Sequence, residues 1–427
     1  MNPTMKTEIH PLTDERAVTF THQSGLTVTV LEKPLHTYYA LLATNFGSVH
    51  REMKIDGVRY TLPDGTAHFL EHKLFDQPDG SDAFAKFAAI GADANAFTTY
   101  LSTACLFDCT QQFAEGLEVL LKFVTSAHFT EETVAKELPI IGEEIAADRD
   151  APAEVLYSDI LKALYKNHPV RRAILGSPAS IAKLTPRLLS TVHRALYHPA
   201  RLHLCVAGRV TPEEVEAVCD RVFGGTLPLA PIVEYLPVKE PRAVAKSRTT
   251  RKMSVSQPTV ALGIKLLPEE DEDIPKTAAA LEVLGCLLFG ESSALSHRLY
   301  REGVISSTLS FESTMNRSFG HLIVFANTDD PEKTLAALKE ALYGFNAPDP
   351  TDFLACKRME LGDLFQSLDS TEEYASDYLA HRMEGSNLFA YADALSALTP
   401  ADVTDLVKRL RAPDLTAEAL VLLKHKS

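Results

Sequence analysis

The sequence has few basic residues for its length. Lysine and arginine number 42 against 57 aspartate and glutamate residues, so the formal net charge of the 427-residue chain is −15. A nucleic-acid binder needs a basic face that neutralises phosphates, and an anionic membrane attracts basic segments. The charge therefore argues against nucleic acid and against a membrane surface as partners. No low-complexity tract occurs, so the composition is that of a globular protein.

Long apolar runs are also missing. No stretch approaches the roughly 18–20 apolar residues that cross a bilayer. The start of the chain, MNPTMKTEIHPLTDE, has no basic segment followed by an apolar one. We therefore expect neither a membrane span nor a secretory signal. The apolar patch at 281–289 fits a buried helix.

Cysteine is sparse and scattered. The six cysteines are Cys105, Cys109, Cys205, Cys219, Cys286 and Cys356. Buried free thiols are the common state of such residues in an intracellular protein, so we expect a cytoplasmic location. Cys105 and Cys109 share one face of a predicted strand, and we expect neither a disulfide nor a metal there.

The length suggests more than one domain, since a domain typically takes roughly 150 residues. Residues 224–250 contain four prolines and little periodicity, as a linker does. We predict an N-terminal domain at 1–225, a linker at 226–250 and a C-terminal domain at 251–427. The strand pattern PTVALGIKLL after the linker resembles the earlier YYALLATNF, which indicates an internal duplication.

The order of the predicted elements favours an α+β fold. Alternating residues at 17–32 predict two strands joined by a turn at Ser24 and Gly25. A helix is expected from Thr66 to about Phe75, and strands at 92–101 and 103–110 follow a second helix. Strands and helices arrive in blocks, whereas a doubly wound parallel sheet would need strict alternation.

The segment GTAHFLEHKLF carries the clearest chemistry. His68 and His72 are four residues apart in a predicted helix, and Glu71 lies three after His68, so all three share a face. Two imidazoles and one further carboxylate would suit a catalytic zinc with an open position for water. Glu71 could then take a proton from that water. The order His-x-x-Glu-His is the inverzincin pattern. The alternative is an amphipathic helix whose histidines pack or face water.

A third ligand can come from KELPIIGEEIAADRDAP. Glu137 and Glu144 are two helical turns apart and face the same way, whereas Glu143 points about 100° away. Pro139 lies between them and makes their relative rotation less certain, because an interior proline removes a backbone hydrogen bond. An isolated glutamate here would be read as part of a solvated helix face.

Five ordered segments together resemble the pitrilysin/insulinase family of zinc peptidases. They are HFLEHKLF, NAFTTYLSTACLF, KELPIIGEEI, HPVRRAILGSPASIAKLT and YHPARLHLCVAGRV. The resemblance is to the bacterial two-domain members, which are related to the mitochondrial processing peptidases. It runs from about Val18 to Val210 and continues more faintly beyond. It implies two similar domains, each a mostly antiparallel sheet with helices on one face, that form half of a clam-like chamber.

The resemblance also implies roles for single residues. His68, His72 and Glu144 correspond to the ligands of one zinc ion per chain, Glu71 to the general base, and Glu137 to an acidic residue that supports the site. Asn95, Ala96 and Phe97, within the segment 95–99, match an edge strand to which a peptide substrate adds. An ordinary half-buried strand would explain that segment equally well.

One departure from the family concerns the second half of the chain. Active members use an arginine and a tyrosine there to hold the substrate. In SSALSHRLYREGVISSTLS, Arg301 can fill the arginine position, but Ser306 stands where the tyrosine is expected, and Tyr300 is out of register. We therefore expect a partner: a paralogous subunit that supplies the arginine and tyrosine, or a second copy in a homodimer.

Two functions remain open on the sequence. The first is a zinc-dependent endopeptidase acting on peptides or small unfolded polypeptides, and the negative charge permits a preference for basic ones. The second is a non-catalytic peptide-binding or scaffold subunit of a peptidase-like heterodimer. The intact set of His68, Glu71, His72 and Glu144 favours the enzyme. His168, His193, His198 and His203 are expected to be structural.

Overall fold

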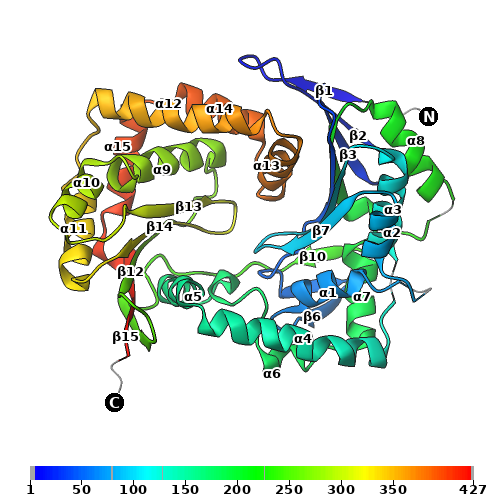
Figure 1. Cartoon of the computed structure of the whole chain (residues 1–427), viewed down its shortest axis with the longest axis horizontal. Coiled ribbons are helices and arrows are strands. Elements are labelled where there is room, and N and C mark those ends of the chain that lie inside the picture. The colour runs from blue at the N-terminus through cyan, green and yellow to red at the C-terminus, as the bar shows by residue number, and fades with distance from the viewer. Residues whose placement is uncertain (1–4, 78–79, 127, 226, 425–427) are drawn as a thin grey trace. The chain divides into compact units, whose positions relative to one another are not determined.

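The computed structural model describes residues 5–77, 80–126, 128–225 and 227–424. They form two compact units that interleave along the chain (Figure 1). Unit 1 comprises Met1–Ile145, Ala173–Pro237 and Phe365–Met383, and unit 2 comprises Ala146–Arg172, Val238–Leu364 and Glu384–Ser427. The sequence predicts one linker at 226–250 and does not predict that the chain passes between the two units several times.

Unit 1 is built on a seven-stranded, mostly antiparallel sheet. The strand order is β1-β2-β3-β9-β4-β8-β7, and only β3 and β9 pair in parallel. The strands are β1 (Lys6–Ile9), β2 (Arg16–Thr21), β3 (Thr27–Glu32), β4 (Tyr38–Thr44), β7 (Asp93–Thr98), β8 (Thr103–Cys109) and β9 (Leu202–Gly208). The predicted hairpin at 17–32 is β2–β3, and Gly25 takes φ +88° at its turn, where glycine is favoured.

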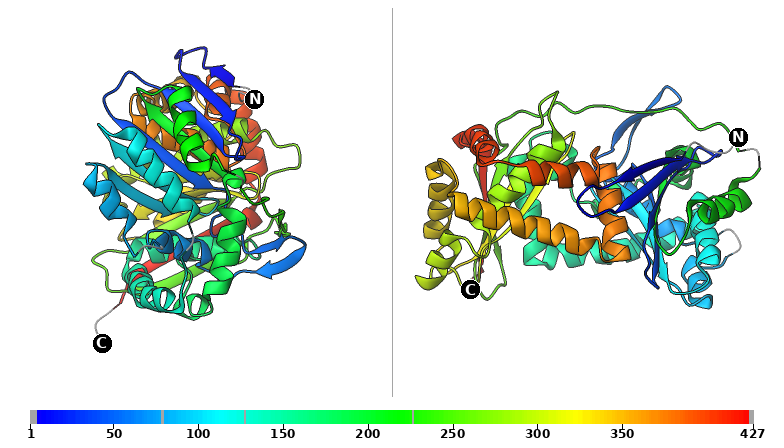
Figure 2. Two further views of the ribbon diagram at one scale, coloured as in Figure 1. Left: turned by 90° about the vertical axis from the view of Figure 1, so that its right-hand side faces the viewer. Right: turned by 90° about the horizontal axis from the view of Figure 1, so that it is seen from above.

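The helices of unit 1 cover both faces of this sheet. They are α1 (Thr66–Leu74), α2 (Ala83–Ala89), α3 (Phe113–Thr125), α4 (Glu131–Asp150, in unit 1 through Ile145), α6 (Pro178–Ile181), α7 (Pro186–Leu196), α8 (Pro212–Phe223) and α13 (Thr371–Met383). Helices α2, α3 and α8 lie side by side (Figures 1 and 2). Helix α13 packs Tyr374 and Tyr378 against β4 and β9, which explains why every residue of β9 is buried.

Unit 1 also contains a small second sheet, which the sequence pattern does not predict. It has the order β10-β5-β6, with β5 (Glu52–Ile55), β6 (Val58–Thr61) and β10 (Val233–Tyr235). Asp56 and Gly57 turn the hairpin with φ +50° and +81°, the conformation that Asp-Gly favours in a two-residue turn. Strand β10 comes from the segment expected to be a linker.

Unit 2 contains a five-stranded sheet in the order β11-β15-β12-β14-β13. Its strands are β11 (Arg248–Met253), β12 (Thr259–Lys265), β13 (Ser310–Met315), β14 (Gly320–Asn327) and β15 (Thr416–Leu423). Its helices are α5 (Pro152–Leu164), α9 (Ile274–Phe289), α10 (Ala294–Arg301), α11 (Pro331–Gly344), α12 (Pro350–Ser367, in unit 2 through Leu364), α14 (Leu388–Ala397) and α15 (Pro400–Leu410).

Helix α5 packs closely on one face of this sheet, where Gly263 of β12 lies. A Cβ atom at Gly263 would come within 2.9 Å of Ile160 and Leu164 of α5, so glycine lets the helix approach. Helices α9 and α11 also pack on the sheet, and together with it they enclose an apolar core that includes Leu262. The mostly antiparallel α+β class predicted from the sequence is confirmed, with one helix added on the second face in each unit.

The segment Ile274–Arg301 is long and apolar enough to cross a membrane by length and composition, which the sequence reading did not anticipate. Its most apolar window has a mean hydropathy of 1.5, and 67% of that window is buried. Because α9 contributes a large share of the core of unit 2, this burial accounts for its apolar character.

Candidate metal centre

Helix α1 presents three of the predicted residues on one face. It begins after Gly65, whose φ of +90° suits glycine, and a Cβ there would come within 2.5 Å of the Leu175 carbonyl oxygen. The apolar side of the helix is anchored by Phe69 and Leu70, both fully buried. His68 and Glu71 are also buried, at 7% and 8% exposure. Burying polar groups costs free energy unless their polar atoms form hydrogen bonds or bind a metal.

Helix α4 brings two glutamates to the same place. Pro139 lies inside this helix, yet the helix continues from Glu131 to Asp150. Despite the proline, Glu137 and Glu144 point the same way, because both approach the histidines of α1. Glu143 is exposed on the same helix and is not part of this group.

The three predicted ligands converge. Glu144 places one carboxylate oxygen 3.5 Å from Nε2 of His68 and the other 3.6 Å from Nε2 of His72. One ligand atom from each residue lies within 4.8 Å of the others. Tetrahedral zinc with bonds of about 2.0–2.2 Å needs ligand atoms roughly 3.3–3.6 Å apart, so both measured distances fit. The set of two imidazoles and one carboxylate also leaves a fourth position open.

The histidines are held in different electrostatic states. Burial lowers the pKa of His68 to about 4, and the neighbouring His72 adds to this, so the His68 imidazole is neutral at pH 7. Burial also lowers the pKa of His72, but the hydrogen bond and negative charge of Glu137 outweigh it, and the net pKa is raised. A neutral imidazole is the form that binds a metal.

Glu137 supports His72 from behind. Its carboxylate lies 3.0 Å from Nδ1 of His72 and 3.5 Å from Nζ of Lys73. Burial raises the pKa of Glu137, but these two partners lower it further than burial raises it, so the carboxylate is ionised. An ionised acceptor at Nδ1 keeps the proton there and leaves Nε2 of His72 free for a metal.

Glu71 faces the edge strand β7. The hydroxyl of Thr98 donates a hydrogen bond of 2.6 Å to Oε2 of Glu71. Burial raises the pKa of Glu71, and the bond from Thr98 opposes that rise. Glu71 is absent from the cluster of three ligand atoms, as a proton acceptor beside a metal should be. Thr98 is a contact that the sequence did not reveal.

The predicted substrate strand is an edge of the seven-stranded sheet. Among the described residues β7 pairs only with β8, so its outer backbone groups have no strand partner. Asn95 and Phe97 are exposed, Phe97 at 38%, whereas Ala96 is half-buried. An open edge of this kind can accept an extended peptide as an added strand.

Arg301 and Ser306 belong to unit 2, whereas every member of the metal cluster belongs to unit 1. Arg301 ends α10, is exposed, and donates from Nε to the carbonyl oxygen of His297 over 3.3 Å. Ser306 donates to Oε1 of Gln257 over 2.7 Å. The role of Arg301 in substrate binding stays a prediction.

The four histidines expected to be structural each contact a neighbour in the protein. Nε2 of His193 donates to the Val124 carbonyl oxygen, and Nε2 of His203 lies 3.0 Å from the hydroxyl of Thr29. His198 bonds the Pro228 carbonyl, and Nδ1 of His168 accepts the amide N–H of Val170.

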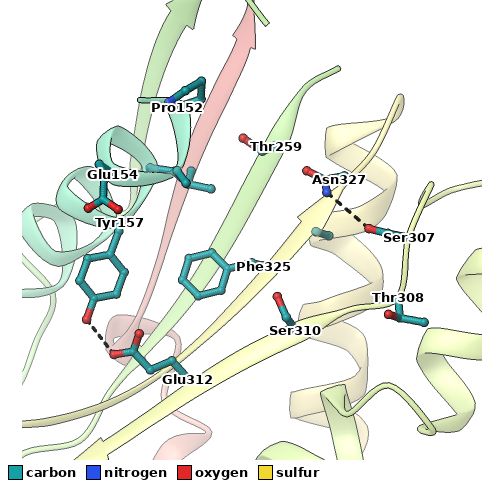
Figure 3. A pocket seen from close by; sticks show the side chains of 13 residues that line it. Pro152, Glu154, Tyr157, Thr259, Ser307, Thr308, Ser310, Glu312, Phe325 and Asn327 are labelled. Atoms are coloured by element: carbon teal, nitrogen blue, oxygen red, sulfur yellow. Dashed lines mark hydrogen bonds between the residues drawn. The ribbon is translucent and has the colours of Figure 1, made fainter. Parts of the chain in front are cut away.

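Unit 2 contains a pocket that sequence reasoning missed. Its volume is about 730 Å³, and it lies beside the start of α5 and the ends of β12, β13 and β14 (Figure 3). Within it, Tyr157 donates a hydrogen bond of 2.7 Å to Glu312, whose carboxylate is also 3.7 Å from Nε2 of His321. Burial raises the pKa of Glu312, but these two partners lower it overall. The pocket therefore carries a negative charge.

Comparison with known protein families matches two successive parts of the chain to models of the M16 peptidases. Residues 33–178 match the family described as insulinase (peptidase family M16), and residues 183–354 match the family described as peptidase M16 inactive domain. A protein of Bacillus subtilis (strain 168), named uncharacterized zinc protease YmfH, is 33% identical over 399 residues. The match covers 92% of this chain and 93% of that protein.

Solved structures extend the likeness to the fold. The crystal structure of an M16-like peptidase from Alicyclobacillus acidocaldarius matches with a TM-score of 0.91 at 29% identity, over 99% of both chains. A protease from Helicobacter pylori matches with a TM-score of 0.79 over 98% of this chain and 99% of its own. At 19% identity the latter likeness shows the fold alone.

Proposed function

Because this chain belongs to the insulinase family of peptidases, M16, we propose that it is a zinc-dependent endopeptidase that hydrolyses peptides or small unfolded polypeptides. Family membership agrees with the resemblance seen in the sequence, and relatives named zinc proteases support a peptidase-like function. The observation that carries the proposal is the convergence of His68, His72 and Glu144, with Glu144 at 3.5 and 3.6 Å from the two imidazoles.

The proposed mechanism assigns each group one task. Bound zinc would supply a Lewis acid that lowers the pKa of a bound water to about 7. Glu71 accepts the proton as the water attacks the scissile carbonyl, and later gives it to the leaving amine. Thr98 holds the carboxylate of Glu71 in place, and Glu137 fixes the ring of His72. The outer edge of β7 holds the peptide backbone in an extended form.

The second candidate is a non-catalytic subunit. It is favoured by one observation, the serine at position 306 where active relatives have a tyrosine. Under the enzyme proposal the same observation calls for a paralogous subunit, or a second copy of the chain, that completes the substrate clamp. Activity of the purified chain that does not rise when a paralogue is added would remove the need for that partner.

The test compares zinc content and peptide hydrolysis in matched variants. Glu71→Gln should keep about one zinc per chain and lose activity by roughly 100-fold or more, because it loses its proton acceptor. His68→Ala and Glu144→Ala should lose the zinc itself. Glu143→Gln, on the exposed side of α4, is the matched control and should change neither quantity. Retained hydrolysis in Glu71→Gln would overturn the enzyme proposal.

A further inference from the structure

Helix α12 is held to unit 2 by few buried side chains. Of its 18 residues only Phe353 and Cys356 are buried, and these two are three apart and so share one face. The apolar side chains of Leu354 and Met359 are 43% and 44% exposed. A helix with so small a buried face gains little from packing, so its attachment depends on other contacts.

The strongest of these contacts is covalent. Cys356 is joined in a disulfide bond to Cys286 of α9, 70 residues earlier in the chain. Helix α9 lies in the core of unit 2, with eleven of its sixteen residues buried, so this end of the bond is fixed. A second, non-covalent contact comes from Nζ of Lys357, which donates to the carbonyl oxygens of Ser396 and Leu398 over 2.5 and 3.0 Å.

The bond is shielded from solvent. Cys286 is 1% exposed and Cys356 is 8% exposed. A dissolved thiol must approach a disulfide along the sulfur–sulfur axis, so exchange at this site requires α12 to move away from α9. The disulfide therefore keeps α12 attached to α9, and the attached helix in turn keeps solvent thiols away from the disulfide.

Two carboxylates flank the disulfide, one on each helix. Glu282 is one turn before Cys286 on α9, and Glu360 is one turn after Cys356 on α12. Glu282 accepts a hydrogen bond from Ser313. Burial raises the pKa of Glu360 to about 7, and the charges of Glu282 and Asp363 contribute, so these carboxylates lie near one another. Above about pH 7, where Glu360 is mostly ionised, these carboxylates repel an approaching anionic thiolate.

The remaining cysteines do not take part. Cys105, Cys109, Cys205 and Cys219 are buried in unit 1 without a bond to one another. Burial raises the pKa of each of these thiols, which makes them poor nucleophiles. Among the described residues, Cys286 and Cys356 are therefore the one pair of cysteines placed so that they can form and break a disulfide bond.

We propose that the Cys286–Cys356 pair is a redox latch that fastens α12 to α9 when oxidised and releases it when reduced. Release is thiol–disulfide exchange with a small thiol: two RSH are oxidised to RSSR, and the protein disulfide is reduced to two cysteine thiols. Closure is the reverse reaction with a small disulfide. The latch is a property of unit 2 and does not rest on the proposed peptidase activity.

The location of the latch gives it a consequence beyond the helix. The chain leaves unit 2 within α12 and enters unit 1 at Phe365, just before α13 packs on β4 and β9. Oxidation therefore fixes the segment that carries the chain from one unit to the other, and reduction frees it. The sequence indicated buried free thiols as the common state of its cysteines and gave no partner to Cys286 or Cys356, whereas the structure joins these two.

The test is hydrogen exchange of residues 350–364 in the full-length protein. Air-oxidised wild type should show four titratable thiols after denaturation, and six after reduction with dithiothreitol. Reduction should raise the exchange rate of 350–364 by about tenfold, since local opening no longer requires breaking the bond. Cys286→Ser should exchange at that higher rate with or without reductant, and Cys356→Ser offers the same test if the first variant folds poorly. Cys219→Ser, buried and unbonded, is the matched control and should behave as wild type.

Two results would overturn the latch: six free thiols in the oxidised wild type, or an exchange rate at 350–364 that reduction leaves unchanged. The flanking carboxylates have their own test. At a pH well above 7, where Glu360 is ionised, cationic 2-aminoethanethiol should reduce the bond several-fold faster than anionic mercaptoacetate at equal thiolate concentration. Salt at 1 M should reduce the difference between the two rates. Equal rates at low salt would overturn the role of Glu282 and Glu360.

Discussion

Replacing Thr98 with valine would remove one hydroxyl group from β7 and leave the size of the side chain almost unchanged. The lost contact is the hydrogen bond of 2.6 Å to Glu71, the proposed proton acceptor. Thr98 is not among the three ligand residues, so the metal should stay bound. The variant therefore separates the positioning of the general base from the binding of zinc.

The expected magnitude follows from the kind of bond. A hydrogen bond to a charged group contributes about 1.5–3 kcal/mol, and each 1.4 kcal/mol is a factor of about ten in rate. If the bond holds Glu71 in its productive state, Thr98→Val should lower kcat/KM by roughly tenfold or more. Thr98→Ser keeps the hydroxyl and is the matched control, with kcat/KM expected within about threefold of wild type.

The assay is hydrolysis of a quenched fluorescent peptide by protein of known zinc content. The expected result is a full complement of zinc in both variants, with slow turnover in Thr98→Val alone. Wild-type kcat/KM in a zinc-loaded Thr98→Val variant would refute the reasoning, because the hydroxyl would then have no part in the state of Glu71. Loss of zinc would place Thr98 in the support of the ligands instead.

Three other perturbations test separate parts of the structure. Glu137→Gln should weaken zinc affinity by about 10- to 100-fold in a competition titration with a chelator, because the ring of His72 loses its ionised acceptor. Glu272→Gln should lower the free energy of unfolding by about 2 kcal/mol at pH 7 in urea, since Glu272 binds Arg409 through two bonds of 2.8 Å. Burial raises the pKa of Glu272, but the bonds to Arg409, followed by those from Thr277 and the backbone N–H of Glu269, lower it from 4.5 to about 2 overall, so this difference should be full above pH 4.5 and shrink as the pH falls toward 2. Lys265→Met should destabilise unit 2 by about 3 kcal/mol or more on thermal unfolding, because it leaves the buried carboxylate of Glu240 without its cation.

The sequence predicted those parts of the site that a single helix defines. Helical spacing placed His68, Glu71 and His72 on one face, and the seven-residue interval placed Glu137 and Glu144 on one face. The resemblance to the zinc peptidases then gave each of them its role. Thr98 could not be found in this way, because its bond to Glu71 depends on where β7 lies beside α1. Periodicity describes one element at a time and carries no information about contacts between elements.

The same reason explains what was missed in the fold. The β5–β6 hairpin is short and polar, so it reads as a loop until β10 pairs with it from more than 170 residues away. The disulfide joins cysteines 70 residues apart, and the pocket beside Glu312 gathers residues from separate segments. Helix α5 comes from the first half of the chain but belongs to unit 2, and α13 comes from the second half but belongs to unit 1. The local sequence pattern does not encode this tertiary arrangement.

Anomalous diffraction at the zinc edge from crystals of the wild-type protein tests the central claim most directly. The account predicts one zinc peak per chain, bonded to Nε2 of His68, Nε2 of His72 and the carboxylate of Glu144, with Glu71 beside it and not bound. A peak held by other residues, or zinc-saturated crystals with no peak at this cluster, would contradict the account.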